Sequence, residues 1–154
     1  MNGFTVEAMP TEVAQYVRSN KKSPVYGFPA QKEVAAGRAP CRHCLKLIRP
    51  QEELLLFTYD PFQENKARPL PGPVYLHAEE CRRFSEKAIF PELYKGRQLT
   101  FCAYDAKRNL VKEILLRNGA EEATANELFA IREVEYVHVR STEAGCYLFR
   151  LERA

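Results

Sequence analysis

Hydrophobic and polar residues alternate with a period of two in several short stretches of the chain, which is the pattern of β-strands with two different faces. Residues 99–104 and 134–140 alternate in this way, and residues 110–116 and 145–151 predict the strands that pair with them. Between them, residues 121–131 carry Leu128 and Phe129 on one side and predict a helix. The order strand, strand, helix, strand, strand favours an antiparallel sheet with a helix on one face.

The pattern is less regular before residue 92. Residues 4–8 predict a short strand, and Pro10 opens a short helix through about Arg18. The apolar run 54–59 and residues 74–77 predict two partner strands. Residues 82–90 fit an amphipathic helix that Pro91 stops.

These elements predict an α+β fold, with an antiparallel sheet and a few short helices, in a single domain over residues 1–154. All ten prolines lie between Pro10 and Pro91. We therefore divide the domain into a proline-rich part at about 1–91 and a strand-strand-helix-strand-strand part at about 92–154. The proline-rich part contains the candidate metal ligands described below.

Composition narrows the class of protein further. Hydrophobic residues make up 45% of the 154 residues and charged residues 28%, as in an ordinary soluble protein. No apolar run approaches the roughly 20 residues needed to span a bilayer, so we expect no membrane insertion. The first residues lack a charged segment followed by an apolar one, which makes the cytoplasm the expected location. We expect a monomer or a weak homodimer.

Three cysteines and one histidine have a spacing typical of metal sites. Cys41 and Cys44 form a C-x2-C pair, and His77 and Cys81 form an H-x3-C pair, giving C-x2-C-x32-H-x3-C. Zinc takes four ligands in a tetrahedron, and Cys3His is a common structural set. If a helix begins near Ala78, His77 and Cys81 share one of its faces. The spacing predicts a zinc-knuckle-like Cys3His site that holds a structural zinc.

Other interpretations of the same residues stay open. The group could be a metal-free core or surface cluster, or a catalytic zinc with Glu79 or Glu80 as its base. A nucleophilic Cys44–His77 pair is a further possibility, but it needs a third orienting group and an oxyanion site. Four candidate ligands fill the tetrahedron, which favours the closed structural site over the catalytic one. His43 lies between the two cysteines, and we expect it to point outward and not to be a ligand. We assign no catalytic residue.

A second region of interest is the 14-residue connection 60–73, which is longer than most hairpin loops and is a candidate ligand-facing loop. Tyr59 and Asp60 adjoin it and are possible ligand-facing residues. His138 alternates with two valines, so we expect a partly exposed histidine on a sheet face and a third possible ligand-facing residue. An alternative function is a small-molecule enzyme that uses this face and this loop.

Nucleic-acid binding is the second alternative. Basic residues concentrate near the start of the chain, where five of them supply charge: Lys21, Lys22, Arg38, Arg42 and Lys46. The net charge of the whole chain is only +3, which argues against a dedicated nucleic-acid binder. The leading hypothesis is therefore a zinc-stabilised module, without catalysis, that binds an unknown protein or small-molecule ligand.

Several stretches of the chain together resemble one known family. These are Pro40-Cys41-Arg42, residues 53–59 and 72–76, and a C-terminal run with residues 136–140, Gly145-Cys146-Tyr147 and residues 150–154. They are similar to the bacterial domain of unknown function family 1203, to which no activity is assigned. The resemblance implies a small, cytosolic, single-domain bacterial protein. It also implies that the zinc set belongs to a subgroup, which makes His138 and Gly145-Cys146 candidates for a site independent of zinc.

Overall fold

The computed structural model describes residues 3–63, 67–117 and 119–154. Two compact units make up the chain: Met9–Arg83 forms the N-terminal unit, and Phe84–Ala154 with the residues up to Ala8 forms the C-terminal unit. The division falls at Phe84, a few residues before the change of pattern at about residue 92, and the first strand belongs with the end of the chain. Each unit is described separately below.

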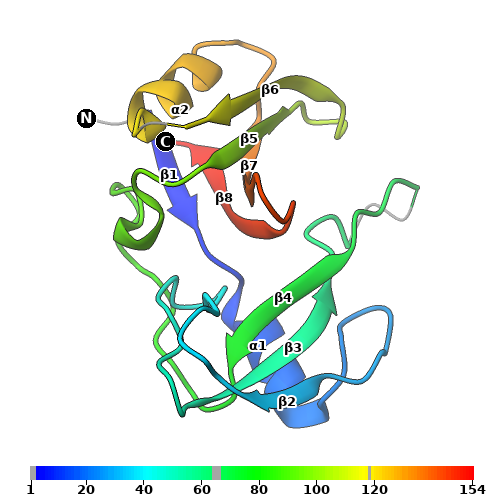
Figure 1. Ribbon diagram of the computed structural model, residues 1–154. Coiled ribbons are helices and arrows are strands. Elements are labelled where there is room, and N and C mark those ends of the chain that lie inside the picture. Colours follow the sequence, from blue (N-terminus) through cyan, green and yellow to red (C-terminus); the bar gives the residue numbers. More distant parts are fainter. Residues whose placement is uncertain (1–2, 64–66, 118) are drawn as a thin grey trace. The chain divides into compact units, whose positions relative to one another are not determined.

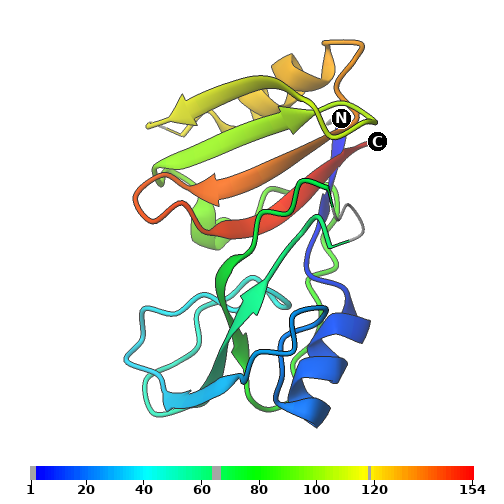
Figure 2. The same ribbon diagram turned by 90° about the vertical axis from the view of Figure 1, so that its right-hand side faces the viewer.

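The C-terminal unit is built on a five-stranded antiparallel sheet with the order β1-β8-β7-β5-β6 (Figures 1 and 2). Its strands are β1 (Phe4–Glu7), β5 (Leu99–Tyr104), β6 (Leu110–Leu116), β7 (Tyr136–Ser141) and β8 (Tyr147–Arg153). A short 3-10 helix, η1 (Glu92–Tyr94), precedes β5, and α2 (Glu121–Phe129) connects β6 to β7. The four later strands and α2 confirm the strand-strand-helix-strand-strand prediction.

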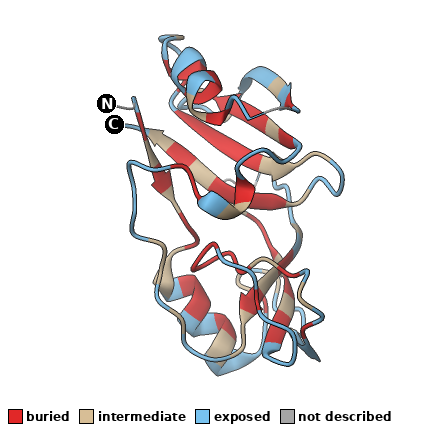
Figure 3. Cartoon of the chain, turned by 60° about the vertical axis from the view of Figure 1, so that its left-hand side comes forward, coloured by how far each residue is buried: buried red, intermediate tan, exposed pale blue. Residues whose placement is uncertain are grey.

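Large apolar side chains fill the core of this unit. Phe149 on β8 is fully buried, and its ring lies 5.4 Å from the rings of both Phe90 and Tyr94. Val137 and Val139 of β7 are also fully buried. In Figure 3 the buried residues lie along the strands of this sheet and on one side of the helices. The period-two pattern that predicts these strands thus also identifies the residues that hold the sheet together.

The N-terminal unit contains a three-stranded antiparallel sheet with the order β2-β3-β4. Its elements are α1 (Thr11–Asn20), β2 (Gln31–Val34), β3 (Glu53–Tyr59) and β4 (Gly72–His77). The predicted pairing of the apolar strand 54–59 with residues 74–77 is confirmed by the register, in which Leu55 faces Leu76. Strand β2 was not predicted, because all four of its residues are exposed and carry no apolar face.

Helix α1 lies beside the three-stranded sheet (Figures 1 and 2). It begins directly after Pro10, which fits the first turn of a helix because proline has no N–H to leave unpaired. Its buried side chains are Val13, Ala14 and Val17, which lie on one face at helical spacing. Arg18 follows Ala14 by one turn, at the border of this buried face, and it contacts the candidate metal site described below. The last turn ends at Lys21, whose left-handed backbone closes the helix.

The predicted helix at 82–90 is wrong. The described chain from Glu80 to Glu86 has no helical turn, and the N–H of Val6 donates to the carbonyl of Lys87 at 2.7 Å. Arg83 ends one unit and Phe84 begins the other, so this segment connects the two units. The segment bonds to β1 and forms only turns within itself, such as the N–H of Ile89 to the carbonyl of Glu86 at 3.1 Å, so its apolar spacing was a misleading signal for a helix.

The α+β fold class with antiparallel sheets and short helices is confirmed. None of the described helices has the length and apolar character that crossing a membrane requires.

Candidate metal centre

The C-x2-C pair lies on a tight turn that is attached to the edge strand β4. The N–H of Cys41 donates to the carbonyl of Lys46 at 2.9 Å, and the N–H of Leu45 donates to the carbonyl of Cys41 at 3.0 Å. Leu45 adopts a left-handed backbone, with φ of 57°, which lets the chain reverse directly after Cys44. The N–H of Arg42 donates to the carbonyl of Tyr75 on β4 at 3.0 Å. These bonds hold the turn close to His77, which ends the same strand.

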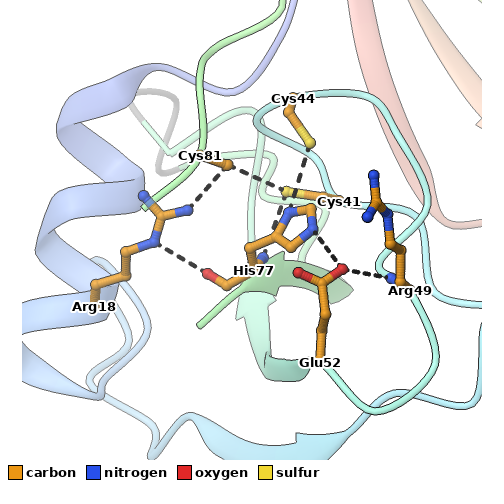
Figure 4. Close-up of polar contacts among 7 residues, drawn as sticks. All are labelled: Arg18, Cys41, Cys44, Arg49, Glu52, His77 and Cys81. Atoms are coloured by element: carbon orange, nitrogen blue, oxygen red, sulfur yellow. Dashed lines mark hydrogen bonds and ion pairs between the residues drawn. The ribbon is translucent and has the colours of Figure 1, made fainter. Parts of the chain in front are cut away.

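The four predicted ligands converge on one point. One ligand atom from each of Cys41, Cys44, His77 and Cys81 lies within 4.8 Å of all the others, and Figure 4 shows the four side chains facing one another. The Sγ atoms of Cys41 and Cys81 are 3.8 Å apart, and Cys44 Sγ lies 3.6 Å from His77 Nδ1. Cys41 and Cys44 are buried, and the other two are half-buried.

These separations can be compared with an ideal zinc tetrahedron. Bond lengths of about 2.3 Å for Zn–S and about 2.0–2.1 Å for Zn–N place two sulfurs about 3.8 Å apart, and a sulfur and a nitrogen about 3.6 Å apart. The Cys41–Cys81 and Cys44–His77 distances match both edges. The residues therefore fit a tetrahedral metal ion bound through three sulfurs and the Nδ1 of His77.

His77 and Cys81 do not converge through a helix, as the sequence analysis assumed. Residues 78–83 are bends and irregular chain, and the N–H of Ala78 donates to the carbonyl of Glu53 at 3.1 Å. This bond extends the β3–β4 pairing one residue past His77, and the chain then bends back to Cys81. The prediction of the ligand set does not depend on the helix, because any turn after His77 can return a side chain four residues later.

The carboxylate of Glu52 lies beside the imidazole ring of His77. Its Nε2 atom lies 3.8 Å from Glu52 Oε1, and the same carboxylate oxygen accepts the N–H of Arg49 at 2.9 Å (Figure 4). A ligating histidine commonly pairs its other ring nitrogen with a carboxylate, which fixes the ring and raises its basicity. Glu52 thus occupies the position of an outer carboxylate next to the metal ligand.

The sulfur of Cys81 is contacted by donors from two other side chains. Arg18 Nη2 lies 3.1 Å from Cys81 Sγ, and Arg18 Nε donates to the carbonyl of His77 at 3.0 Å (Figure 4). His43 Nδ1 also lies 3.1 Å from this sulfur, while its Nε2 lies 2.9 Å from Thr11 Oγ1. A thiolate can only accept, so for an ionised Cys81 the His43 proton is on Nδ1 and Thr11 donates to Nε2.

The prediction that His43 points outward is wrong. Its side chain is 2% exposed and bonds both Thr11 and Cys81. The residues around His43 do not indicate this arrangement, because its partner Thr11 lies 32 residues away on α1. Arg18 and Glu52 were missed for the same reason: they reach the site only through the packing of α1 and the register of β3.

The electrostatics of the group favour a bound cation. Hydrogen bonds from Cys41, followed by those from Cys44, lower the pKa of Cys81, while hydrogen bonding to Cys41 and Cys81 raises the pKa of Cys44. The thiol of Cys41 first, and then that of Cys81, raise the pKa of His77 to about 10. Three crowded sulfurs therefore cannot all ionise by themselves. A divalent cation at their centre removes this restriction, because it stabilises all three thiolates at once.

The family model described as Protein of unknown function (DUF1203) matches residues 38–153 of the chain. The chain belongs to DUF1203. The match includes all four candidate ligands and the C-terminal run as far as Arg153. Comparison with curated proteins and with solved structures gave no match. The family membership carries no activity, so the function of this DUF1203 protein has to be argued from its residues.

The three possible ligand-facing residues of this DUF1203 protein are all buried. Tyr59 ends β3, and Asp60 follows it with both carboxylate oxygens engaged: Oδ1 accepts the N–H of Phe62 at 2.8 Å, and Oδ2 accepts the hydroxyl of Tyr26 at 3.0 Å. Asp60 therefore shapes the start of the 60–73 connection. Residues 64–66 of that connection lie outside the described residues. The ligand-facing role of Tyr59 and Asp60 stays a prediction.

The expected partial exposure of His138 is wrong, since the residue is fully buried. Its strand β7 is a central strand of the sheet, and residues on both of its faces are buried. The His138 ring lies against three tyrosine rings, at 5.4 Å from Tyr104, 5.2 Å from Tyr136 and 4.9 Å from Tyr147. Alternation along one strand shows which residues share a face, but it cannot show that the polar face is covered.

The two cysteines outside the ligand set differ from each other. Positions in predicted strands made both of them expected core residues, and Cys102 is indeed buried on β5. Cys146 lies in the turn before β8 and is half-buried, so it is not a strand core residue. Neither is part of the metal-binding group found among the described residues.

Removing the charge of Arg18 tests its role beside Cys81. Three thiolates bound to one Zn²⁺ ion carry a net charge of −1, and the Arg18 guanidinium offsets it through a bond to a half-buried sulfur. We expect Arg18→Gln to weaken zinc binding about 10-fold or more, as is typical for a lost outer-shell partner. Competition with a chromophoric chelator measures the affinity. Arg38→Gln is the matched control, because Arg38 is exposed in the same unit. Equal affinities of the two variants would contradict this role.

A pH dependence follows from His138. Burial first, and then the charges of Arg140, Arg150 and Arg108, hold its pKa well below the usual value. The unfolded chain therefore takes up a proton below about pH 6.5 that the folded chain does not, so stability falls as the pH drops through that range. The other titratable groups on this face are three tyrosines, one cysteine and three glutamates: Tyr104, Tyr136, Tyr147, Cys102, Glu7, Glu113 and Glu152.

We expect wild-type protein to lose more stability between pH 7.5 and pH 5.5 than His138→Gln protein does. Denaturant unfolding at both pH values gives the two losses, and the contribution of the metal site is common to both proteins. Equal losses in the two proteins would contradict a depressed pKa of His138.

Proposed function

We propose that this protein is a zinc-stabilised, non-catalytic module in which Cys41, Cys44, His77 and Cys81 hold a structural zinc ion. The observation that supports this proposal is the closed ligand set: four protein ligands lie within 4.8 Å of one another, two pairs of them at the edge lengths of a zinc tetrahedron, and four ligands fill a tetrahedral site without water or substrate. Bound zinc would connect the Cys41–Cys44 turn to the end of β4. It would also connect both to α1 through Arg18 and His43.

The same atoms include a thiol, an imidazole and a carboxylate in a row, namely Cys44, His77 and Glu52. A nucleophilic cysteine needs a lowered pKa and an accessible sulfur. Cys44 has a raised pKa because of its hydrogen bonds to Cys41 and Cys81, and it is only 8% exposed. Two further sulfurs also lie within ligand distance. A structural metal site therefore accounts for more of the geometry than a catalytic thiol does.

Zinc stoichiometry tests the proposal directly. Protein purified without a histidine tag should contain about one zinc per chain, and X-ray absorption at the zinc edge should show three sulfurs at about 2.3 Å and one nitrogen at about 2.0 Å. Cys146→Ser should keep the metal, because Cys146 lies outside the set. Less than about 0.3 zinc per chain, or a spectrum with a bound water in place of a sulfur, would overturn a closed structural zinc.

A further inference from the structure

The polar face of the five-stranded sheet carries a second constellation, which belongs entirely to the C-terminal unit. The register places Cys102, His138 and Arg150 side by side on β5, β7 and β8 (Figure 1). Tyr104 faces Tyr136 two residues further toward the end of β5, in the next pair on the same face of the sheet. On the other side of His138, Arg140 of β7 faces Thr100 and Tyr147. The tyrosines and arginines thus surround His138 on three adjacent strands.

Each of the three tyrosines that contact His138 has a guanidinium over its ring. Arg150 Cζ lies 4.0 Å from the ring centre of Tyr136. The two other pairs are longer: Arg108 Cζ lies 5.4 Å from the Tyr104 ring, and Arg140 Cζ lies 5.9 Å from the Tyr147 ring. Stacking holds a guanidinium by its face and leaves its N–H edges pointing sideways, where they can donate to an acceptor.

The charges on this face are only partly paired. Three guanidinium groups surround a histidine whose own proton they repel. Glu152 lies 2.9 Å from Arg150 Nε, and Glu7, which faces Arg150 in the register, pairs with Lys87 at 3.0 Å. Glu113 faces Cys102 across the β5–β6 pair. Arg140 makes no ion pair with the residues that the structure describes, so its charge is complementary to an anion.

Arg140 supplies the specific recognition element. Its Nη1 donates to the carbonyl of Gly145 at 3.2 Å. Its Nε and Nη2 atoms are withdrawn from water and make no hydrogen bond to the residues that the structure describes. These two nitrogens form the side edge of the guanidinium, whose parallel N–H groups match the two oxygens of a carboxylate or phosphate. A buried charged donor without an acceptor costs free energy, and a bound oxyanion removes that cost.

We propose that this face of the sheet binds a small oxyanion, a carboxylate or phosphate group, with the side edge of Arg140 as its bidentate anchor. Arg150 and Arg108 add charge around the anchor, and the tyrosine rings hold all three guanidinium groups in place. The neutral His138 ring separates the charges without adding a fourth. This site does not depend on the proposed zinc, which lies in the other unit.

Titration of the full chain with inorganic phosphate and, separately, with acetate tests the proposal. Chemical shifts of the arginine side-chain Nε–H groups report binding by NMR. We expect saturable shifts at Arg140 with at least one probe in the millimolar range, and which probe binds tighter identifies the oxyanion. If neither probe gives saturation up to about 50 mM, well beyond the millimolar dissociation constants of weak ligands, the proposal is overturned.

Variants separate the anchor from general charge. Arg140→Lys keeps the charge but loses the two parallel N–H donors at Nε and Nη2, and we expect it to weaken binding at least tenfold. Arg132→Gln is the matched control, since it removes an exposed charge of the same unit, and it should bind within twofold of wild type. Arg140→Lys binding as tightly as wild type would overturn the bidentate anchor. If that variant does not fold, Arg150→Lys and the wild-type titration decide the question. The anion titration can also be run after zinc has been removed with a chelator. The chemical shifts at Arg140 then report anion binding separately from the proposed zinc site.

Discussion

Replacing Cys41 by serine is expected to abolish stable zinc binding and to lower the free energy of unfolding of the N-terminal unit by about 4 kcal/mol. Cys41 is fully buried, its sulfur accepts the N–H of His77 at 3.4 Å, and it lies at a tetrahedral edge from Cys81. A ligand present at 1,000 times its dissociation constant stabilises a fold by about 4 kcal/mol, and structural zinc in small peptides contributes more. For a unit of this size, loss of this amount corresponds to a decrease of about 16–32 °C in melting temperature.

Thermal unfolding with metal analysis of the same samples measures this effect. Cys146→Ser is the matched control, because it makes the same chemical change at a half-buried turn outside the ligand set. A strong chelator added to wild-type protein should reproduce the loss, and zinc should reverse it. An unchanged melting temperature in Cys41→Ser protein, with zinc present in the wild type, would show that the metal does not stabilise the fold.

Replacing Phe149 by alanine should have the second large effect, a loss of about 3–5 kcal/mol that leaves the zinc content unchanged. Phe149 is fully buried on β8, and its ring contacts both Phe90 and Tyr94. Removing a buried phenyl group loses its transfer free energy and leaves a cavity that its neighbours fill only in part.

Leu115→Ala is the control for this prediction. Leu115 is a large apolar residue of the same sheet, but its side chain is 52% exposed on the edge strand β6, so its loss should cost about 0.5 kcal/mol or less. Denaturant unfolding compares the two variants, and metal analysis shows whether zinc stays bound. A similar, small cost for both substitutions would contradict the central role of Phe149 in this core.

The elements that were predicted from the sequence share a strong local signal. Strands β3, β5 and β7 have apolar or alternating runs, and the ligand set has a spacing that zinc chemistry recognises without knowledge of the fold. Strand β2 has no apolar face, and it exists because its backbone pairs with β3. The apolar spacing of residues 82–90 is that of a helix, but their backbone forms only isolated turns and a bond to β1.

The surroundings of the site depend on contacts between distant parts of the chain. Arg18 reaches Cys81 across 63 positions in the sequence, and Thr11 reaches His43 across 32. His138 needs three tyrosines from three strands before its burial can be understood. Such arrangements follow from register and packing, which a pattern along one segment does not contain.

The pairing of β1 with β8 bears on the order in which the chain folds during synthesis. Phe4 pairs with Arg153, so β1 cannot join its sheet until residue 153 has left the ribosome. All four metal ligands, in contrast, lie within the continuous segment Met9–Arg83. Domains generally fold as units as they emerge, and contacts that are close in sequence form first. The N-terminal unit can therefore close around a metal ion before β8 is translated and β1 finds its partner strand.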